Sequence, residues 1–84
     1  MKPIRLSNHA RARCRLRGTN EQEVRSAVRR GVREPAKEGR SICRLNFQYN
    51  QTWRGRHYAI KQVAPVIVER PDEIVVVTVY TFFF

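Results

Sequence analysis

The residues best suited to chemistry lie in three places along the chain. His9, Arg13 and Arg17 recur every fourth residue in a segment of good helix formers, so one side of a helix would carry all three. Lys61 and Tyr80 lie in segments whose composition is typical of strands. An imidazole, an ammonium group and a phenol can transfer protons, and guanidinium groups can stabilise a charged phosphorane. These residue types would suit cleavage of RNA by its own 2′-hydroxyl, with four catalytic candidates: His9, Arg13, Lys61 and Tyr80.

A wider set of cationic and aromatic residues would hold the nucleic acid. Aromatic side chains interleaved with cations can stack on bases while the cations neutralise phosphates. The segment from Trp53 to Tyr58 shows this interleaving, and Arg54 in it is also an electrostatic candidate for the reaction. The expected RNA contacts come from the first helix, this segment and the last strand: Arg11, Arg15, Arg17, Trp53, Arg54, Arg56, His57 and Thr78.

Plain structural roles are open for the same residues. The helical ladder that begins at His9 could form hydrogen bonds to neighbouring elements and lock the helix onto a sheet. Arg11 and Arg15 point roughly away from that ladder and could be a solvated surface. Trp53 and Tyr58 could serve core or edge packing.

The overall charge favours a polyanionic partner. Seventeen Lys and Arg against seven Asp and Glu give a net charge of +10 on 84 residues, which creates a field that attracts phosphates. Most of the cations are arginines, whose planar fork binds phosphate in a bidentate manner and stacks on bases. Twelve of the cations lie in residues 1–40, so the expected helices carry most of the field. A cationic surface without a specific partner is the alternative.

Other classes of site and location find little support in the sequence. The seven acids form no carboxylate cluster, and two lone cysteines form no zinc motif, so we expect neither a metal nor a cofactor. Cys14 falls in a helical pattern and Cys43 in a strand pattern, and we expect free thiols. No apolar run approaches the roughly 20 residues of a membrane span, and the start lacks a signal-peptide stretch. We expect a cytoplasmic protein with no membrane partner.

The candidate residues must be positioned by helices in the first part of one domain over residues 1–84. Ser7 precedes a helix expected over residues 8–17, with Leu16 on its buried side. Thr19 and Gln22 form a capping-box pattern that opens a second helix ending at Gly31. We expect the next stretch, residues 32–40, to be irregular.

The chain after Gly39 shows the alternation of strands. Residues 50–52 are expected to turn the first strand into the second, and Gly55 suggests a bulge or a close approach. Pro65 would place the beginning of the third strand at an edge or an entry position. The expected fold is α+β, with two N-terminal helices packed on a four-stranded, curved antiparallel sheet whose strands span residues 41–49, 53–62, 63–69 and 74–81.

The last strand has one apolar and one mixed face. Val75, Val77 and Val79 are expected to lie under the helices, which places Thr78 and Tyr80 on the opposite face. The three phenylalanines at positions 82–84 would form a sticky tail if exposed. We expect this tail to pack against the domain, a partner or a second copy, which makes it a candidate surface for a homo-oligomer.

A family resemblance adds to these expectations. The chain carries Ser7-Asn8-His9-Ala10 with Arg13 and Arg17-Gly18, then a capped helix ending in Gly31 and strands closing on Val76-Val77-Thr78-Val79-Tyr80. Over nearly its whole length it resembles a family of small uncharacterised bacterial domains related to the RelE/ParE toxins, within the ribonuclease superfamily that includes barnase, EndoU and colicin-type toxins. The resemblance implies a RelE-like fold that cleaves RNA on the open face of the sheet. It also implies possible association with the ribosome and a cognate antitoxin as partner.

The resemblance bears on particular residues as well. RelE-like mRNA endonucleases often use Arg, Lys and a Tyr close to the C-terminus, which matches Tyr80 together with Lys61 or Arg54. ParE-type relatives share the fold but act on gyrase without cutting RNA. Three functions therefore stay open: a metal-independent endoribonuclease, a non-catalytic nucleic-acid-binding module, and a toxin-fold protein that binds a protein partner.

Overall fold

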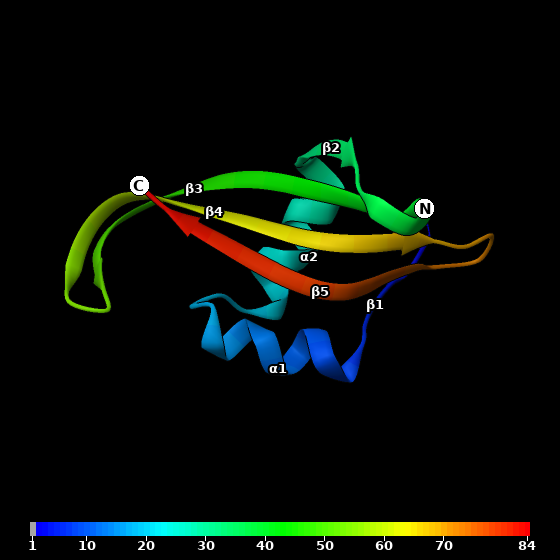
Figure 1. Ribbon diagram of the computed structural model, residues 1–84, viewed down its shortest axis with the longest axis horizontal. Helices are drawn as coiled ribbons and strands as arrows, with labels where there is room; N and C mark the ends of the chain where they lie inside the picture. Colours follow the sequence, from blue (N-terminus) through cyan, green and yellow to red (C-terminus); the bar gives the residue numbers. More distant parts are fainter. Residues whose placement is uncertain (1) are drawn as a thin grey trace.

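A computed structural model describes residues 2–84 as two helices and one five-stranded sheet (Figure 1). The strand order is β1-β5-β4-β3-β2, in which β1 and β5 are parallel and all other neighbours are antiparallel. The expected α+β class is confirmed, whereas the expected four-stranded antiparallel sheet matches only in part, because the sheet has five strands and one parallel pair. The elements are β1 (Ile4–Leu6), α1 (Asn8–Leu16), α2 (Glu21–Arg30), β2 (Val32–Pro35), the 3-10 turn η1 (Lys37–Gly39), β3 (Ser41–Trp53), β4 (Arg56–Glu69) and β5 (Ile74–Phe83).

The helices and the sheet enclose one apolar core. In Figure 1, α2 lies behind the sheet and α1 lies along the side of β5. Buried residues of α2 at helical spacing, Val24, Ala27 and Val28, meet strand residues such as Val63 and Val76. Neither helix among residues 2–84 is long and apolar enough to cross a membrane.

Short polar side chains fix the starts of both helices. The Ser7 hydroxyl accepts a hydrogen bond from the Ala10 amide at 3.1 Å, as expected for an N-cap. The second helix begins one residue later than the capping box predicted, because Asn20 caps it by accepting from the Glu23 amide at 2.9 Å. The Glu23 carboxylate in turn accepts a hydrogen bond from the Thr19 hydroxyl at 2.8 Å.

The two additional strands are short and lie at the edges of the sheet. β1 spans three residues and pairs with the first part of β5, so the element order begins with a strand and not with a helix. β2 spans four residues that are all exposed, and together with η1 it occupies most of the stretch expected to be irregular. Segments of three or four residues are too short for apolar alternation to identify a strand.

β4 is a single long strand where two were expected. It runs from Arg56 to Glu69 between β3 and β5, so Pro65 lies in a central strand and not at an edge. The Cα pairs of the β3–β4 ladder on either side of this proline are Ile42 with Val66 and Leu45 with Val63. A proline has no N–H to donate, and it is accommodated in the interval between these pairs.

The β3–β4 hairpin turns later than the sequence predicted. The expected turn at residues 50–52 is instead a β-bulge, where the register shifts between Gln48 and Gln51 and Asn50 has a φ of 48°. The chain reverses at Arg54 and Gly55, whose φ angles of 52° and 81° fit a two-residue type I′ turn. The hairpin therefore extends beyond the helices (Figure 1).

A second bulge decides which side chains of β5 face the helices. Val66 pairs with Thr78 and Ile67 with Val76, so Val77 has no opposite residue. The core residues of β5 are consequently Ile74, Val76 and Val79, so the expectation is confirmed for Val79 and wrong for Val75 and Val77. Thr78 and Tyr80 do lie on the opposite, open face, as expected.

The two cysteines are free and buried, as expected. Burial raises the pKa of both thiols, which lowers the fraction of reactive thiolate near neutral pH. Native protein is therefore expected to react slowly with iodoacetamide at Cys14 and Cys43, whereas urea-unfolded protein should react at the rate of a free thiol. Mass spectrometry after timed labelling measures both rates, and rapid labelling of the native protein at either cysteine would contradict the buried positions.

Candidate nucleic-acid interface

Most of the positive charge of this protein is not neutralised by neighbouring carboxylates. Seven cations pair with five of the acids. Lys2 and Arg33, for example, both pair with Glu69, and the hydrogen bond from Lys2 helps to lower the pKa of the Glu69 carboxyl. Within residues 2–84, the other ten have no carboxylate oxygen within 4.0 Å: Arg13, Arg15, Arg17, Arg29, Arg30, Lys37, Arg40, Arg54, Arg56 and Arg70.

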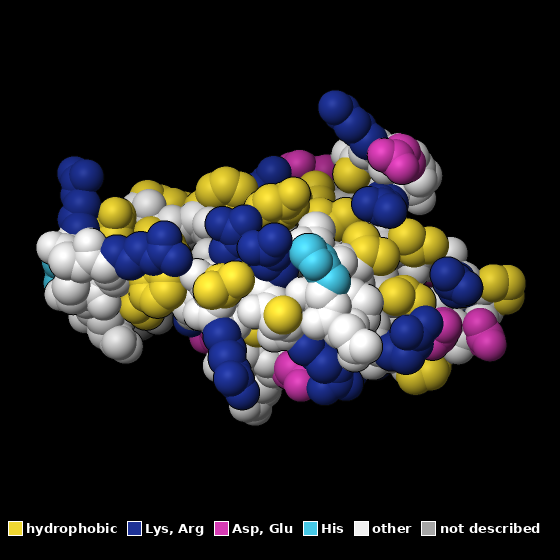
Figure 2. All heavy atoms as spheres, turned by 60° about the horizontal axis from the view of Figure 1, so that its bottom comes forward, with side chains coloured by type: hydrophobic (Ala, Val, Ile, Leu, Met, Phe, Trp, Pro, Cys, Tyr) yellow, Lys and Arg dark blue, Asp and Glu magenta, His cyan; other side chains and the backbone are white. Residues whose placement is uncertain are grey.

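These cations share the surface with apolar side chains. Figure 2 shows dark blue Lys and Arg side chains across one whole face, with yellow apolar side chains between them. The magenta acidic side chains are found mainly on the right half and along the rims of this view. The face thus offers positive charge beside apolar surface, which is the combination that phosphates and bases would contact.

Arg17 and Tyr80 are brought together by the packing of α1 alongside β5. The amide of Ser7, before the helix, donates to the Val76 carbonyl at 3.0 Å, and the Thr81 hydroxyl donates to the Arg17 carbonyl at 2.6 Å. The Arg17 guanidinium lies 5.6 Å from the centre of the exposed Tyr80 ring, a cation–π arrangement. Its Nε is buried and has no hydrogen-bond partner among residues 2–84.

Tyr80 also lines a groove on the open face of the sheet, which we call the Tyr80 groove. Its volume is about 310 Å³, and η1 with its flanking residues forms one wall. Thr78, predicted to contact RNA, lies in the same groove, together with the cations Lys37 and Arg40 and one acid, Glu38. The lining residues are Ala36, Lys37, Glu38, Arg40, Ile42, Val66, Thr78 and Tyr80.

Lys61 occupies a position unlike that of the other candidates. It is buried on the helix side of β4, where its Nζ lies 2.7 Å from Glu23 Oε1 and donates to the Gly18 carbonyl at 3.0 Å. The Tyr49 ring covers the ammonium group at 5.3 Å. These contacts tie the helical hairpin to the sheet, so we leave Lys61 out of the proposed interface.

Trp53 and Arg54 form a second hollow near the end of α1. The Trp53 ring stacks on Phe83 with centroids 5.1 Å apart, and Arg54 lies 5.1 Å from its centroid. Arg54 also donates to the Leu16 carbonyl at 3.0 Å, and Leu16 itself is exposed, contrary to its expected burial. The hollow has a volume of about 200 Å³ and is lined by Leu16, Arg17, Trp53, Arg54, Thr81 and Phe83.

Trp53 packs tightly enough to require a glycine beneath it. A Cβ atom on Gly18, which has a φ of +73°, would lie 2.7 Å from the Trp53 ring. With Phe83 on the ring as well, Trp53 serves the packing role that was the alternative for it. The structure brings Trp53, Arg54 and Arg17 around one hollow, but the indole is already stacked.

The remaining candidates of α1 are spread along the helix. His9 is exposed in the first turn, about 12 Å along the axis from Arg17 at 1.5 Å per residue. Arg11 pairs with Glu21 at 2.8 Å, whereas Arg13 is half-buried and Arg15 is exposed. Within residues 2–84, His9 forms no hydrogen bond with another candidate residue, so the predicted ladder does not converge on one point.

Arg56 and His57 lie exposed at the beginning of β4, next to the hairpin turn. They are separated from the Tyr80 groove by most of the hairpin, since Tyr80 pairs with Ala64 further along β4. The hairpin end is therefore a separate cationic surface.

Several residues of this interface were missed by the sequence reasoning. Lys37 and Arg40 belong to the stretch expected to be irregular, and nothing in their spacing links them to Tyr80. Arg44 was not among the expected RNA contacts, and its proximity to Phe82, 5.4 Å from the ring centre, was not foreseen. The sequence carried one usable signal for this interface, at the end of β5. Tyr80, Phe82 and Phe84 occupy every second position there, so they lie on one face of the strand.

Comparison of this chain with protein-family models, with curated proteins and with solved structures gives no match. The residues 2–84 also contain no group of three or more His, Cys, Asp or Glu side chains arranged to hold a metal ion.

Proposed function

We propose that this protein binds RNA at the surface formed by the Tyr80 groove and the adjoining end of α1. The observation that carries the proposal is the Arg17 guanidinium on the exposed Tyr80 ring at 5.6 Å, next to a groove walled by Lys37 and Arg40. Guanidinium groups bind phosphate, and exposed aromatic rings stack on bases. RNA carries both partners at short intervals.

The charge balance supports a polyanion over a neutral partner. Arg17, Lys37 and Arg40 all belong to the cations without a carboxylate within 4.0 Å among residues 2–84. Cations that have no protein partner are available to displace the counterions of a nucleic acid, and that release makes a large contribution to binding.

Replacement of Arg17 by glutamine tests the proposal through the dependence of affinity on salt. For single-stranded RNA, each phosphate neutralised contributes about −0.7 to the slope of log K against log salt concentration. We expect Arg17→Gln to reduce the magnitude of that slope by about 0.7 and to weaken binding at low salt. Fluorescence anisotropy with a labelled RNA at several KCl concentrations measures both quantities.

Arg5→Gln is the matched control, because Arg5 is exposed but paired with Glu73 at 3.1 Å. It removes the same charge at a distance from the groove and should leave the slope nearly unchanged. Equal effects of the two substitutions would indicate attraction by net charge alone, and a lack of RNA binding at low salt would refute the proposal.

A second candidate function, metal-independent RNA cleavage, is favoured by the exposed Tyr80 phenol beside a guanidinium. In this reaction the 2′-oxygen loses its proton and attacks phosphorus, and the 5′-oxygen leaves with a proton. The products are a 2′,3′-cyclic phosphate and a 5′-hydroxyl. We assign one proton transfer to Tyr80, the other to water, and charge stabilisation to Arg17; His9 is left out because it lies about 12 Å from Arg17 along α1. In this role the protein would be a toxin-type ribonuclease.

A further inference from the structure

Three aromatic side chains form a row on the open face of the sheet. Tyr80, Phe82 and Phe84 occupy alternate positions of β5 and the residue after it, and they are 42%, 44% and 58% exposed. Phe84 continues the strand pairing, since its amide and carbonyl exchange hydrogen bonds with Ile60 at 3.1 and 2.8 Å. Phe83, between them, contacts Trp53 instead. We call Tyr80, Phe82 and Phe84 the aromatic row.

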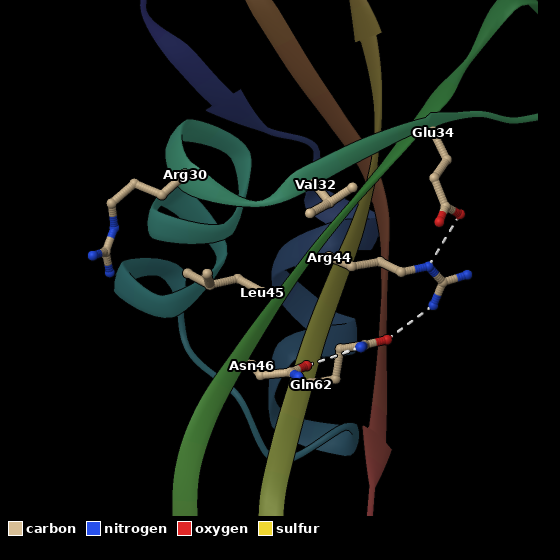
Figure 3. Close-up of a pocket in the computed structure, with 7 residues that line it drawn as sticks. All are labelled: Arg30, Val32, Glu34, Arg44, Leu45, Asn46 and Gln62. Atoms are coloured by element: carbon tan, nitrogen blue, oxygen red, sulfur yellow. Dashed lines mark hydrogen bonds and ion pairs between the residues drawn. The ribbon is translucent and has the colours of Figure 1, made fainter.

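Cations hold positions beside two rings of the row. Arg17 lies on Tyr80 at 5.6 Å, and Arg44 lies 5.4 Å from the Phe82 centroid. Arg44 is kept in place from both sides, because its Nε donates to Glu34 at 3.2 Å and its Nη1 donates to Gln62 Oε1 at 3.0 Å (Figure 3). The row is therefore bordered by two guanidinium groups: Arg44, which is held by Glu34 and Gln62, and Arg17, which has no carboxylate oxygen within 4.0 Å among residues 2–84.

The chemistry of the row identifies its partner. Three neighbouring rings that are all partly exposed form an apolar patch on the surface, and such patches often mark a binding site. Flat rings beside guanidinium groups match a chain of flat, aromatic groups joined by anions. An apolar protein partner would leave Arg17, which has no carboxylate oxygen within 4.0 Å among residues 2–84, without an anion, whereas a nucleic acid supplies both anions and flat rings.

The spacing of the row distinguishes unpaired from paired nucleotides. Alternate residues of a strand are about 7 Å apart, whereas successive stacked bases in a duplex strand are about 3.4 Å apart. Each ring can thus receive one base only if the bases are separated from one another. A duplex also keeps its base faces covered, so it offers the rings nothing to stack on.

We infer that the aromatic row stacks on consecutive unpaired bases of a single-stranded RNA, with Arg17 and Arg44 beside the phosphates. This inference rests on the proposed function, that the protein binds RNA, and it specifies the form of RNA that is bound. Tyr80 belongs both to the row and to the groove, so the bound strand would continue from the row into the Tyr80 groove.

The effect of removing one ring tests the inference. Phe82→Leu keeps an apolar side chain but loses the flat face, and we expect affinity for a short single-stranded RNA to fall at least about fivefold. Phe82→Tyr should retain the affinity. An RNA containing 2-aminopurine provides a direct signal, because its fluorescence is quenched when the base stacks, and the quenching on binding should be smaller with Phe82→Leu.

Pro71→Ala is the surface control, since Pro71 is exposed in the turn between β4 and β5, at the opposite end of β5 from the aromatic row. It should change neither the RNA affinity nor the quenching of 2-aminopurine, and thermal melts should show all variants folded. Wild-type protein that binds no RNA would refute the proposed function itself. If it binds RNA but prefers a duplex, or if Phe82→Leu binds single strands as the wild type does, only the aromatic-row inference fails. A change from dimer to monomer in Phe82→Leu, with RNA affinity unchanged, would identify a self-association surface and would also overturn it.

Discussion

Replacement of Lys61 by methionine is expected to lower the free energy of unfolding by about 2–4 kcal/mol. The substitution leaves the Glu23 carboxylate without its 2.7 Å ammonium partner and the Gly18 carbonyl without its donor. A buried charge that loses its partner destabilises the folded state, but the Glu23 side chain is 23% exposed, and contact with water reduces this effect. For a domain whose total stability is of the order of 5–15 kcal/mol, this is a large loss. Urea unfolding followed by circular dichroism measures it.

Two further variants show whether the loss comes from the buried pair. Lys2→Met breaks the exposed pair with Glu69, and such pairs contribute about 0–1 kcal/mol. Lys61→Met combined with Glu23→Gln should recover part of the stability, because the unpaired charge is gone. If Lys61→Met unfolds at the wild-type urea concentration but abolishes RNA cleavage, Lys61 acts in catalysis and the structural role is refuted.

Tyr80→Phe is expected to reduce RNA cleavage by about 10²- to 10⁴-fold, the range for loss of a general acid or base. The ring that Arg17 and a base would contact is kept, so RNA affinity should change little. The experiment incubates purified protein with a labelled RNA in the presence of a chelator and measures the rate at which fragments with 2′,3′-cyclic phosphate ends form.

Tyr58→Phe serves as the control for this substitution. Tyr58 is half-buried beside Phe83 in the hairpin, with ring centroids 5.5 Å apart. Removal of its hydroxyl should leave the cleavage rate unchanged. If the wild type produces no such fragments, or if Tyr80→Phe cleaves as fast as the wild type, the protein binds RNA without cutting it at this residue.

The helices were predictable from the sequence because their signals are local. Ser7 as N-cap and the helical spacing of Val24, Ala27 and Val28 depend only on neighbouring residues. Strand pairing depends on distant partners, and β1 and β2 are too short to show a pattern. Val75 and Val77 were wrongly expected under the helices, because the bulge at Val77 shifts the alternation of β5 by one residue.

The candidate site was predictable in part for the same reason. Tyr80 was expected on the open face, and it lies there, because the strand alternation after the bulge coincides with the expected one. Its contact with Arg17 depends on where α1 comes to rest along β5, which no spacing in either segment reveals. Lys61 was predicted to be a free, reactive amine. Its ion-pair partner, Glu23, lies on α2, far away in the sequence, so the pairing could not be predicted from the neighbouring residues.

The parallel pairing of β1 with β5 has a consequence for how the chain folds during synthesis. Ile4 pairs with Ile74 and Leu6 with Val76, so the first strand to leave the ribosome waits for the last. At about 5–20 residues per second, β1 would remain unpaired for several seconds while α1 and α2 already form. Contacts between such distant residues also slow folding itself. During that interval Ile4 and Leu6 have no strand partner, so β1 is the last part of the sheet to gain its place.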